Sequence, residues 1–263
     1  MTNIVVLIKQ VPDYEDRKLA DDYTLDRAGS DAVLDEINEK AVEVALQLKE
    51  KHTDAGYNVV ALTAGPEGAE TAIRKALSMG ADEAYHLVDA GLHGSDVVQT
   101  SYALASALGQ IEDVALVIAG NESSDGVGGS VPAILSYYLG LPQLTHMRSI
   151  EIADGKITGE RETDDGVFEL EATLPAVVSV GEKIVEDARF PSFKGIMAAK
   201  KKTVTPLTLE GVGVESGIVG ADASETKITS AAPKPPKSAG EKITDEGEGG
   251  QKIAEYLVGQ KLL

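Results

Sequence analysis

The chain has 263 residues, 43% of them hydrophobic, and its 43 acidic and 24 basic side chains give a net charge of −19. This size and composition are those of a globular protein with one ample core or a core and an appendage, and the acidic balance argues against nucleic acid as a partner. The absence of cysteine excludes disulfides and thiolate chemistry, and the longest apolar runs, IVVLI and VALVIA, are too short to cross a bilayer, so we expect a cytoplasmic protein without membrane insertion.

The first 140 residues alternate between strand and helix patterns. Short apolar runs predict buried strands at Ile4–Ile8, Val59–Thr63, Ala84–Val88 and Val114–Ala119. Apolar positions at helical spacing predict helices over about 35–51, over 69–77 with Gly80 ending it, from Ser95 or Asp96 to about Leu108, and through Ile134 and Leu139. Repeated βα units imply an α/β fold of the Rossmann type, with a parallel sheet and helices on both faces.

The pattern changes after Leu141. Alternating segments joined by ADG and DDG predict antiparallel hairpins over residues 149–174, and Ala176–Val180 returns as a core strand. Beyond Gly211 the chain is rich in Gly, Ser, Ala, Lys and Pro, which cannot build a core, until a short helix is predicted around Ile253 and Leu257. We therefore expect a domain over residues 1–210 and an extended C-terminal arm over 211–263 that packs either on this domain or on a partner.

The strongest candidate for a ligand site follows the fourth strand. Residues 121–130, called the glycine-rich loop below, read NESSDGVGGS and lead into a helix that begins near Ser130. Glycines allow close backbone approach, hydroxyls offer hydrogen bonds, and a helix N-terminus attracts anions. The loop has neither Walker nor GxGxxG spacing and no Lys or Arg, which favours one or two phosphates over a triphosphate. A surface turn that binds nothing is the alternative.

Other catalytic signals are weak. The four histidines are scattered without metal-ligand spacing, and no GxSxG nucleophile motif occurs. The sequence therefore contains no pattern of a self-sufficient active site, and it predicts no metal site.

A second unusual stretch is RFPSFKGIMAAKKK, residues 189–202, called the basic aromatic segment below. It contains two of the three phenylalanines of the chain and no acidic residue. A solvated, lysine-rich turn would be the simplest interpretation of the charge.

Several motifs, in the same order, resemble the beta subunits of the electron transfer flavoprotein family, and most closely its actinobacterial members. They are IVVLIKQVPD, LTAGP, IRKALSMGAD, the glycine-rich loop, TLPAVVSV and the basic aromatic segment. The resemblance covers residues 1 to about 205 and continues more loosely through SAGEK.

This resemblance implies a fold similar to the adenine nucleotide alpha hydrolases and a role as an electron carrier rather than an enzyme. It also implies that the C-terminal arm packs on the partner subunit. Members of the family pair with an alpha subunit that holds most of a redox FAD, and the beta subunit forms one wall of that site and binds AMP. The heterodimer accepts electrons from acyl-CoA and related dehydrogenases and passes them to a membrane quinone oxidoreductase.

The resemblance also implies site residues. The expected AMP contacts are Leu7, Asp35, Glu36, Ile37, Asn38, Ala64, Gly120, Asn121, Glu122, Ser123, Ser124, Asp125, Gly126, Val127, Gly128, Gly129, Ser130 and Val131. Tyr14 is expected to approach the FAD, although an ordinary loop tyrosine is the alternative.

The basic aromatic segment resembles the recognition loop by which family members dock on dehydrogenases, and we expect this loop and the lysine run that follows it over residues 187–202. Phe193, where many members carry leucine, is the expected anchor, because a small interface gains most of its affinity from a buried apolar side chain. The other expected docking residues are Arg189, Phe190, Ile196, Met197, Lys200 and Lys201. The alternative places both phenylalanines in the core of this chain.

Three other interpretations remain open. Electron-bifurcating relatives hold a second FAD in place of AMP, and many members carry a QAIDGDTAQ-like loop where this chain has NESSDGVGGSV. AMP is the favoured occupant. A stand-alone nucleotide-binding protein of the universal-stress type would leave the basic aromatic segment and the long tail unexplained. An adenine-nucleotide-dependent enzyme would need an SGGxDS loop, which the chain lacks.

Overall fold

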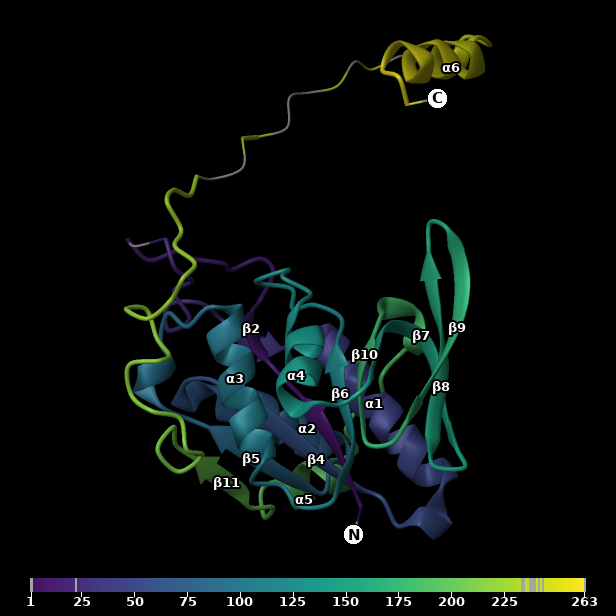
Figure 1. Ribbon diagram of the computed structural model, residues 1–263. Coiled ribbons are helices and arrows are strands. Elements are labelled where there is room, and N and C mark those ends of the chain that lie inside the picture. Colours follow the sequence, from purple (N-terminus) through teal and green to yellow (C-terminus); the bar gives the residue numbers. More distant parts are fainter. Residues whose placement is uncertain are drawn as a thin grey trace. The chain divides into compact units, whose positions relative to one another are not determined.

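The computed structural model describes residues 2–262 except 22, 233–234, 237–239, 241 and 243. The core is a nine-stranded sheet with the strand order β11-β5-β4-β1-β6-β10-β7-β8-β9 (Figure 1). The parallel strands are β1 (Asn3–Leu7), β4 (Asn58–Ala64), β5 (Glu83–Leu87), β6 (Val114–Gly120), β10 (Ala176–Val180) and β11 (Val204–Leu207). The predicted parallel α/β fold is confirmed.

Helices cover both faces of the sheet, as Figure 1 shows. They are α1 (Glu36–Lys51) and α2 (Glu70–Met79) on one face, and α3 (Val97–Leu108) and α4 (Val131–Leu139) on the other. Strand β1 serves both layers because its side chains alternate: Ile4 and Val6 join the core under α1 and α2, whereas Val5 and Leu7 join the core under α3 and α4. This is why the strand is apolar at every position from Ile4 to Leu7.

The helix ends follow the expected local chemistry. Gly80 ends α2 with φ 140°, a conformation that L side chains rarely adopt. Asp96, rather than Ser95, caps α3: its Oδ1 accepts hydrogen bonds from the N–H groups of Val98 and Gln99, both at 3.0 Å. The Gln99 side chain accepts one in return from the Asp96 N–H at 2.9 Å, which completes a capping box.

The antiparallel hairpins are continuous with the main sheet. They comprise β7 (Gln143–Ala153), β8 (Lys156–Thr163) and β9 (Gly166–Thr173). The first part of β7 pairs in parallel with β10, before the antiparallel pairing with β8 begins at Met147. The prediction of residues 149–174 missed this first part, because the register shifts near His146 and leaves the buried Leu144 and Met147 three positions apart instead of two.

Several short elements lack a clear sequence pattern. Strands β2 (Gln10–Pro12) and β3 (Ala32–Leu34) form a separate antiparallel pair, and β11 adds an edge beside β5. The basic aromatic segment, expected to be a loop, contains the helix α5 (Phe193–Ala199), which packs against α2. Four single-turn helices complete the domain: η1 (Thr53–Ala55), η2 (Glu67–Ala69), η3 (Ala90–Leu92) and η4 (Glu182–Ile184).

The compact unit extends further than the sequence predicts. It runs from Met1 to Ile228, so residues 211–228 belong to it and not to an arm. The reason is that Val212, Val214 and Val219 are buried in the core under α3 and α4, although the segment around them is rich in glycines and polar residues.

The second unit, Thr229–Leu263, contains the predicted closing helix as α6 (Gly249–Gly259). Residues 233–234, 237–239, 241 and 243, which include most of the SAGEK motif, lie outside the described residues. Within the described part of the chain, no helix has both the length and the apolar character that crossing a bilayer requires.

Candidate functional site

The predicted ligand residues meet at one edge of the sheet. Leu7, Ala64 and Gly120 are the last residues of β1, β4 and β6, and β1 pairs in parallel with both of the other strands. Their carboxyl ends therefore lie side by side. The start of α1 and the glycine-rich loop follow from this edge, so the structure brings all eighteen residues of the expected set to one region.

The start of α1 holds the glycine-rich loop directly. The buried Asp35 accepts a hydrogen bond through Oδ2 from the Ser124 N–H at 2.8 Å. Asn38 accepts one through Oδ1 from the Lys9 N–H, also at 2.8 Å. A Cβ on Gly120 would lie 2.6 Å from Cγ2 of Ile37, so only glycine allows β6 to come this close to α1. The start of α1 thus fixes the chain at Gly120, directly before the loop, and at Ser124 within it.

Two basic side chains from outside the loop meet Asp125 within it. Lys9 Nζ lies 2.7 Å from Oδ1 of Asp125, and Arg27 Nη2 lies 2.9 Å from Oδ2. Lys9 Nζ also donates to Ser123 Oγ at 3.1 Å. The Asp125 side chain is only 5% exposed. Burial alone raises the pKa of Asp125, but Lys9, Ser123 and Arg27 outweigh it and hold the pKa well below its ordinary value.

The second buried carboxylate of the site behaves differently. Burial raises the pKa of Asp35, and the charge of Asp125 adds to this rise, while the hydrogen bond from Ser124 opposes it. No cation forms an ion pair with Asp35 among the described residues. The pKa values of the two aspartates therefore shift in opposite directions, because Asp125 has two ion-pair partners whereas Asp35 accepts a hydrogen bond from a backbone amide.

The far end of the loop is open. No atom lies within 4 Å of the place that a Cβ would take on Gly128, and Gly126, Val127 and Gly128 are exposed. Val127 and Gly129 have positive φ values of 47° and 60°, which turn the backbone into the start of α4. The first turn of a helix has amide N–H groups without partners inside the helix. The N–H groups of Gly126 and Val127 donate to Asp125 and to the Ser123 carbonyl, so the amides from Gly128 to Val131 are the ones that suit an anionic ligand such as a phosphate.

Sequence reasoning missed the cations of this site. It found no Lys or Arg in the glycine-rich loop, yet the structure places Lys9, Arg17 and Arg27 against it; Arg17 Nη2 donates to the Ser124 carbonyl at 2.7 Å. Lys9 follows almost directly after β1, and a polar residue at the carboxyl end of a buried strand is a signal that could have identified it. The irregular region around Arg17 and Arg27 carries no such signal.

Tyr14 lies beside this cation group. Its side chain is exposed, with 81% of its surface accessible. The guanidinium carbon of Arg17 lies 4.8 Å from the centre of the Tyr14 ring, within the range of a cation–π contact. Arg17 thereby links Tyr14 to the glycine-rich loop, so an aromatic face is available at the side of the candidate site.

The basic aromatic segment is a separate surface. Phe190 and Phe193 are 91% and 81% exposed, which excludes the alternative that they lie in the core of this chain. Ile196 and Met197 are partly exposed on α5, and Lys200 and Lys201 are exposed beyond it. The third lysine of the run differs, because Lys202 donates from Nζ to the Ala81 carbonyl.

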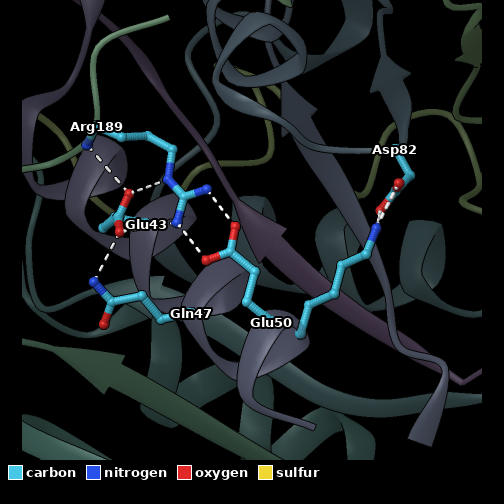
Figure 2. Close-up of polar contacts among 6 residues, drawn as sticks. Glu43, Gln47, Glu50, Asp82 and Arg189 are labelled. Carbon is cyan, nitrogen blue, oxygen red and sulfur yellow. Dashed lines mark hydrogen bonds and ion pairs between the residues drawn. The ribbon is translucent and has the colours of Figure 1, made fainter. Parts of the chain in front are cut away.

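Arg189 also differs from the other expected docking residues. Its side chain is bound within this chain to Glu43 and Glu50 of α1 (Figure 2). The structure therefore places the phenylalanines, Ile196, Met197, Lys200 and Lys201 on an exposed surface. Arg189, at the start of the segment, is instead bound to α1.

Comparisons with known proteins agree with the motifs. The family described as "Electron transfer flavoprotein domain" matches residues 22–210. The chain is 67% identical, over the full length of both proteins, to the electron transfer flavoprotein subunit beta of Mycobacterium tuberculosis and to that of Mycobacterium bovis. It is 32% identical to the subunit beta of Megasphaera elsdenii over 99% of both chains. It is 34% identical to the caffeyl-CoA reductase-Etf complex subunit CarD of Acetobacterium woodii, over 92% of this chain and 91% of that one.

Proposed function

Because the chain belongs to the electron transfer flavoprotein family, as a beta subunit, we propose that it is one half of a heterodimeric electron carrier and not an enzyme. With an alpha subunit it forms the site of a redox FAD, accepts electrons from acyl-CoA and related dehydrogenases in the cytoplasm, and delivers them to a membrane quinone oxidoreductase. The observation that supports a bound nucleotide in this subunit is the sheet edge at which Lys9, Arg27 and the open amides of the glycine-rich loop converge.

The occupant that we propose for this edge is AMP. The amides from Gly128 to Val131 would hold its phosphate at the start of α4, where the helix dipole also favours a negative charge. Lys9 and Arg27 add positive charge, but each is already paired with Asp125. A single phosphate suits this limited surplus of charge better than a triphosphate does. The carboxyl ends of β1 and β4, at Leu7 and Ala64, would border the adenosine.

The same subunit would contribute to the redox site through Tyr14. An FAD supplies the one- and two-electron chemistry when bound. The exposed Tyr14 ring, backed by Arg17, provides a flat apolar wall that can shield a flavin from water. The dehydrogenase would be met elsewhere, at Phe193 and its neighbours in the basic aromatic segment. Exposed lysines at Lys200 and Lys201 would steer an acidic partner, which favours the fast and weak encounter that a mobile carrier needs.

Co-expression with the alpha subunit encoded by the same organism tests this function. The expected result is a yellow heterodimer that releases one FAD and one AMP, identified by absorbance and mass spectrometry, and that an acyl-CoA dehydrogenase reduces. Two FADs per heterodimer would show that FAD, not AMP, occupies the site in this subunit, and would favour an electron-bifurcating flavoprotein. A colourless monomer that binds ATP alone would contradict the proposal and favour a stand-alone nucleotide-binding protein.

A further inference from the structure

Arg189 makes an unusually complete set of contacts with α1. Its Nε lies 2.6 Å from Oε2 of Glu43 and its Nη1 lies 2.5 Å from Oε1 of Glu50, while Nη2 donates to both carboxylates, at 3.1 Å and 3.0 Å. The Arg189 backbone N–H also donates to Glu43, at 3.1 Å. Figure 2 shows the guanidinium held between the two glutamates, with Gln47 on the far side of Glu43. We call Arg189, Glu43 and Glu50 the arginine clasp.

The clasp leaves Arg189 little capacity for another partner. A guanidinium has five N–H donors, and four side-chain hydrogen bonds to the glutamates are already formed. The clasp as a whole carries one positive and two negative charges, so it would not attract an acidic protein. A partner carboxylate could bind Arg189 only by displacing one of the glutamates.

Glu43 explains why the clasp is stable. Its side chain is only 7% exposed, and a buried carboxylate needs hydrogen-bonding partners to remain ionised. Burial raises the pKa of Glu43, but the hydrogen bonds from Arg189 and Gln47 outweigh that effect and lower the pKa below its ordinary value. Glu43, Gln47 and Glu50 lie four and three residues apart, so they share one face of α1. The clasp is therefore built on a rigid helix.

The rest of the basic aromatic segment is fixed on α2. A Cβ on Gly195 would lie 2.4 Å from the Ser78 carbonyl oxygen, so α5 touches the end of α2 closely. Arg74 Nη1 donates to the carbonyls of Ala199 and Lys202, at 2.9 Å and 2.6 Å, and so binds the end of α5. Between Arg189 on one side and Arg74 on the other, Phe190 and Phe193 remain exposed.

We propose that Arg189 is a positioning residue: it fixes the start of the basic aromatic segment to α1. The exposed face of α5 is therefore already ordered before the dehydrogenase binds. This inference rests on the proposed docking function and changes one part of it, because the sequence suggested Arg189 as a contact. Pre-ordering matters since an interface loses affinity for every side chain that must be immobilised on binding. Phe193 contacts the dehydrogenase, and Arg189 determines the position of Phe193.

The test compares variants of the intact heterodimer: Arg189→Gln, Glu43→Gln, Glu50→Gln and the double variant Arg189→Gln/Glu50→Gln. Phe193→Ala represents the loss of a direct contact. Arg148→Gln is the matched control, because Arg148 is also bound to two glutamates, Glu160 and Glu162, but on the hairpins. The first measurement is the KM of an acyl-CoA dehydrogenase for the flavoprotein as electron acceptor, together with kcat.

If Arg189 positions the segment, removing the charge of Arg189 has the same consequence as removing the charge of either glutamate. Arg189→Gln, Glu43→Gln and Glu50→Gln each raise the KM several-fold with little change in kcat, and the double variant is no worse than Arg189→Gln, because both changes break one unit. Arg148→Gln has no effect. If Arg189 were instead a direct contact for an acidic partner, removing Glu43 or Glu50 would leave the KM unchanged or lower it, and the inference would be wrong.

A second measurement does not depend on the redox function. Hydrogen exchange of the amides in residues 192–199 is expected to be about tenfold faster in Arg189→Gln and Glu43→Gln, and unchanged in Phe193→Ala and Arg148→Gln. Unchanged exchange in both clasp variants would overturn the positioning role. Faster exchange in a protein that no dehydrogenase reduces would uphold the clasp and reject the proposed function, so the two failures can be told apart.

Discussion

At the scale of single residues, the charge balance of the glycine-rich loop depends on side chains outside it. Asp125 is the only residue of the loop that forms ion pairs among the described contacts, and both of its partners come from the first 27 residues. Lys9 is the more central of the two, since its Nζ also reaches Ser123 and its backbone N–H is bound to Asn38. One residue thus joins β1, α1 and the loop.

We expect Lys9→Met to lower the free energy of unfolding at pH 7 by about 1–2 kcal/mol, between the values typical of exposed and buried ion pairs, because it leaves a buried carboxylate with one partner fewer. Urea denaturation measures this. The heterodimer should also release its adenylate more easily, as shown by mass spectrometry after dialysis. Lys18→Met is the control: Lys18 pairs with Asp16 at the surface, so its loss should change stability by no more than about 0.5 kcal/mol.

The pH dependence of this variant follows from the sign of the shift. The pKa of Asp125 is lowered in the folded protein, so its ion pairs contribute their full stability above the unfolded pKa of about 3.9. That contribution is lost as the pH falls through the folded pKa. The difference between the wild type and Lys9→Met should therefore be constant near neutral pH and shrink in acid. A difference that grew on acidification would contradict the assigned pair.

At the scale of elements, the site depends on how closely β6 approaches α1. Gly120 ends β6 where a side chain would meet Ile37 and Asn38, the latter with its Nδ2 3.0 Å from the added Cβ. The same helix carries Asp35 and Asn38 at its start and the arginine clasp along its length. Helix α1 is therefore the common frame of the nucleotide edge and of the basic aromatic segment.

Gly120→Ala should lower the free energy of unfolding by about 1–3 kcal/mol, the usual cost of overpacking, because β6 and α1 must move apart. It should also weaken nucleotide retention, since the shift displaces Asn38 from Lys9. Gly128→Ala is the matched variant in the adjoining loop, where the added methyl group meets open space, and its unfolding midpoint in urea should stay close to that of the wild type. Equal midpoints for the two variants would show that the contact at Gly120 is not tight.

At the scale of the whole molecule, the boundary of the compact unit determines which C-terminal residues can be deleted without destabilising the domain. Residues 211–228 are rich in glycine, yet they bury three valines in the core under α3 and α4. The unit that follows contains α6, on which Ile253, Tyr256 and Val258 are exposed. Ile253 and Tyr256 lie three positions apart and therefore share one face of α6, and an exposed apolar face on this helix fits the proposal that the unit packs on the alpha subunit.

Deletion of residues 229–263 should leave the free energy of unfolding of the domain unchanged within about 0.5 kcal/mol, and should weaken assembly with the alpha subunit. Size-exclusion chromatography at decreasing concentration measures assembly. Deletion of residues 211–263 provides the contrast: it should also destabilise the domain by several kcal/mol, because burial of a valine side chain contributes about 1.5 kcal/mol or more. A heterodimer that assembles normally without residues 229–263 would remove the arm from the interface.

Much of the fold could be predicted because its signals are local. The apolar run of β1, the helical spacing in α1 and the turn residues between the hairpins each lie within a few positions of one another. The elements that were missed, β11, α5 and the first part of β7, are short or irregular, and they are stabilised by neighbours distant in sequence. The glycine-rich loop could be predicted from the residues themselves, because it follows a buried strand whose carboxyl end lies at the ligand-binding edge of a parallel sheet. The other candidate nucleotide residues, at the ends of β1 and β4 and at the start of α1, were implied by the resemblance to the family.

The sequence by itself determined the family, through motifs in a fixed order, and the alternation of strands and helices, through periodicities of two and 3.6 residues. Only the tertiary structure decided which charges meet. Lys9 and Asp125 are 116 residues apart, and Arg189 and Glu43 are 146 residues apart. A hydrogen bond depends on distances of about 3 Å between atoms, and the path of the chain between such residues, not the local pattern around either one, sets those distances.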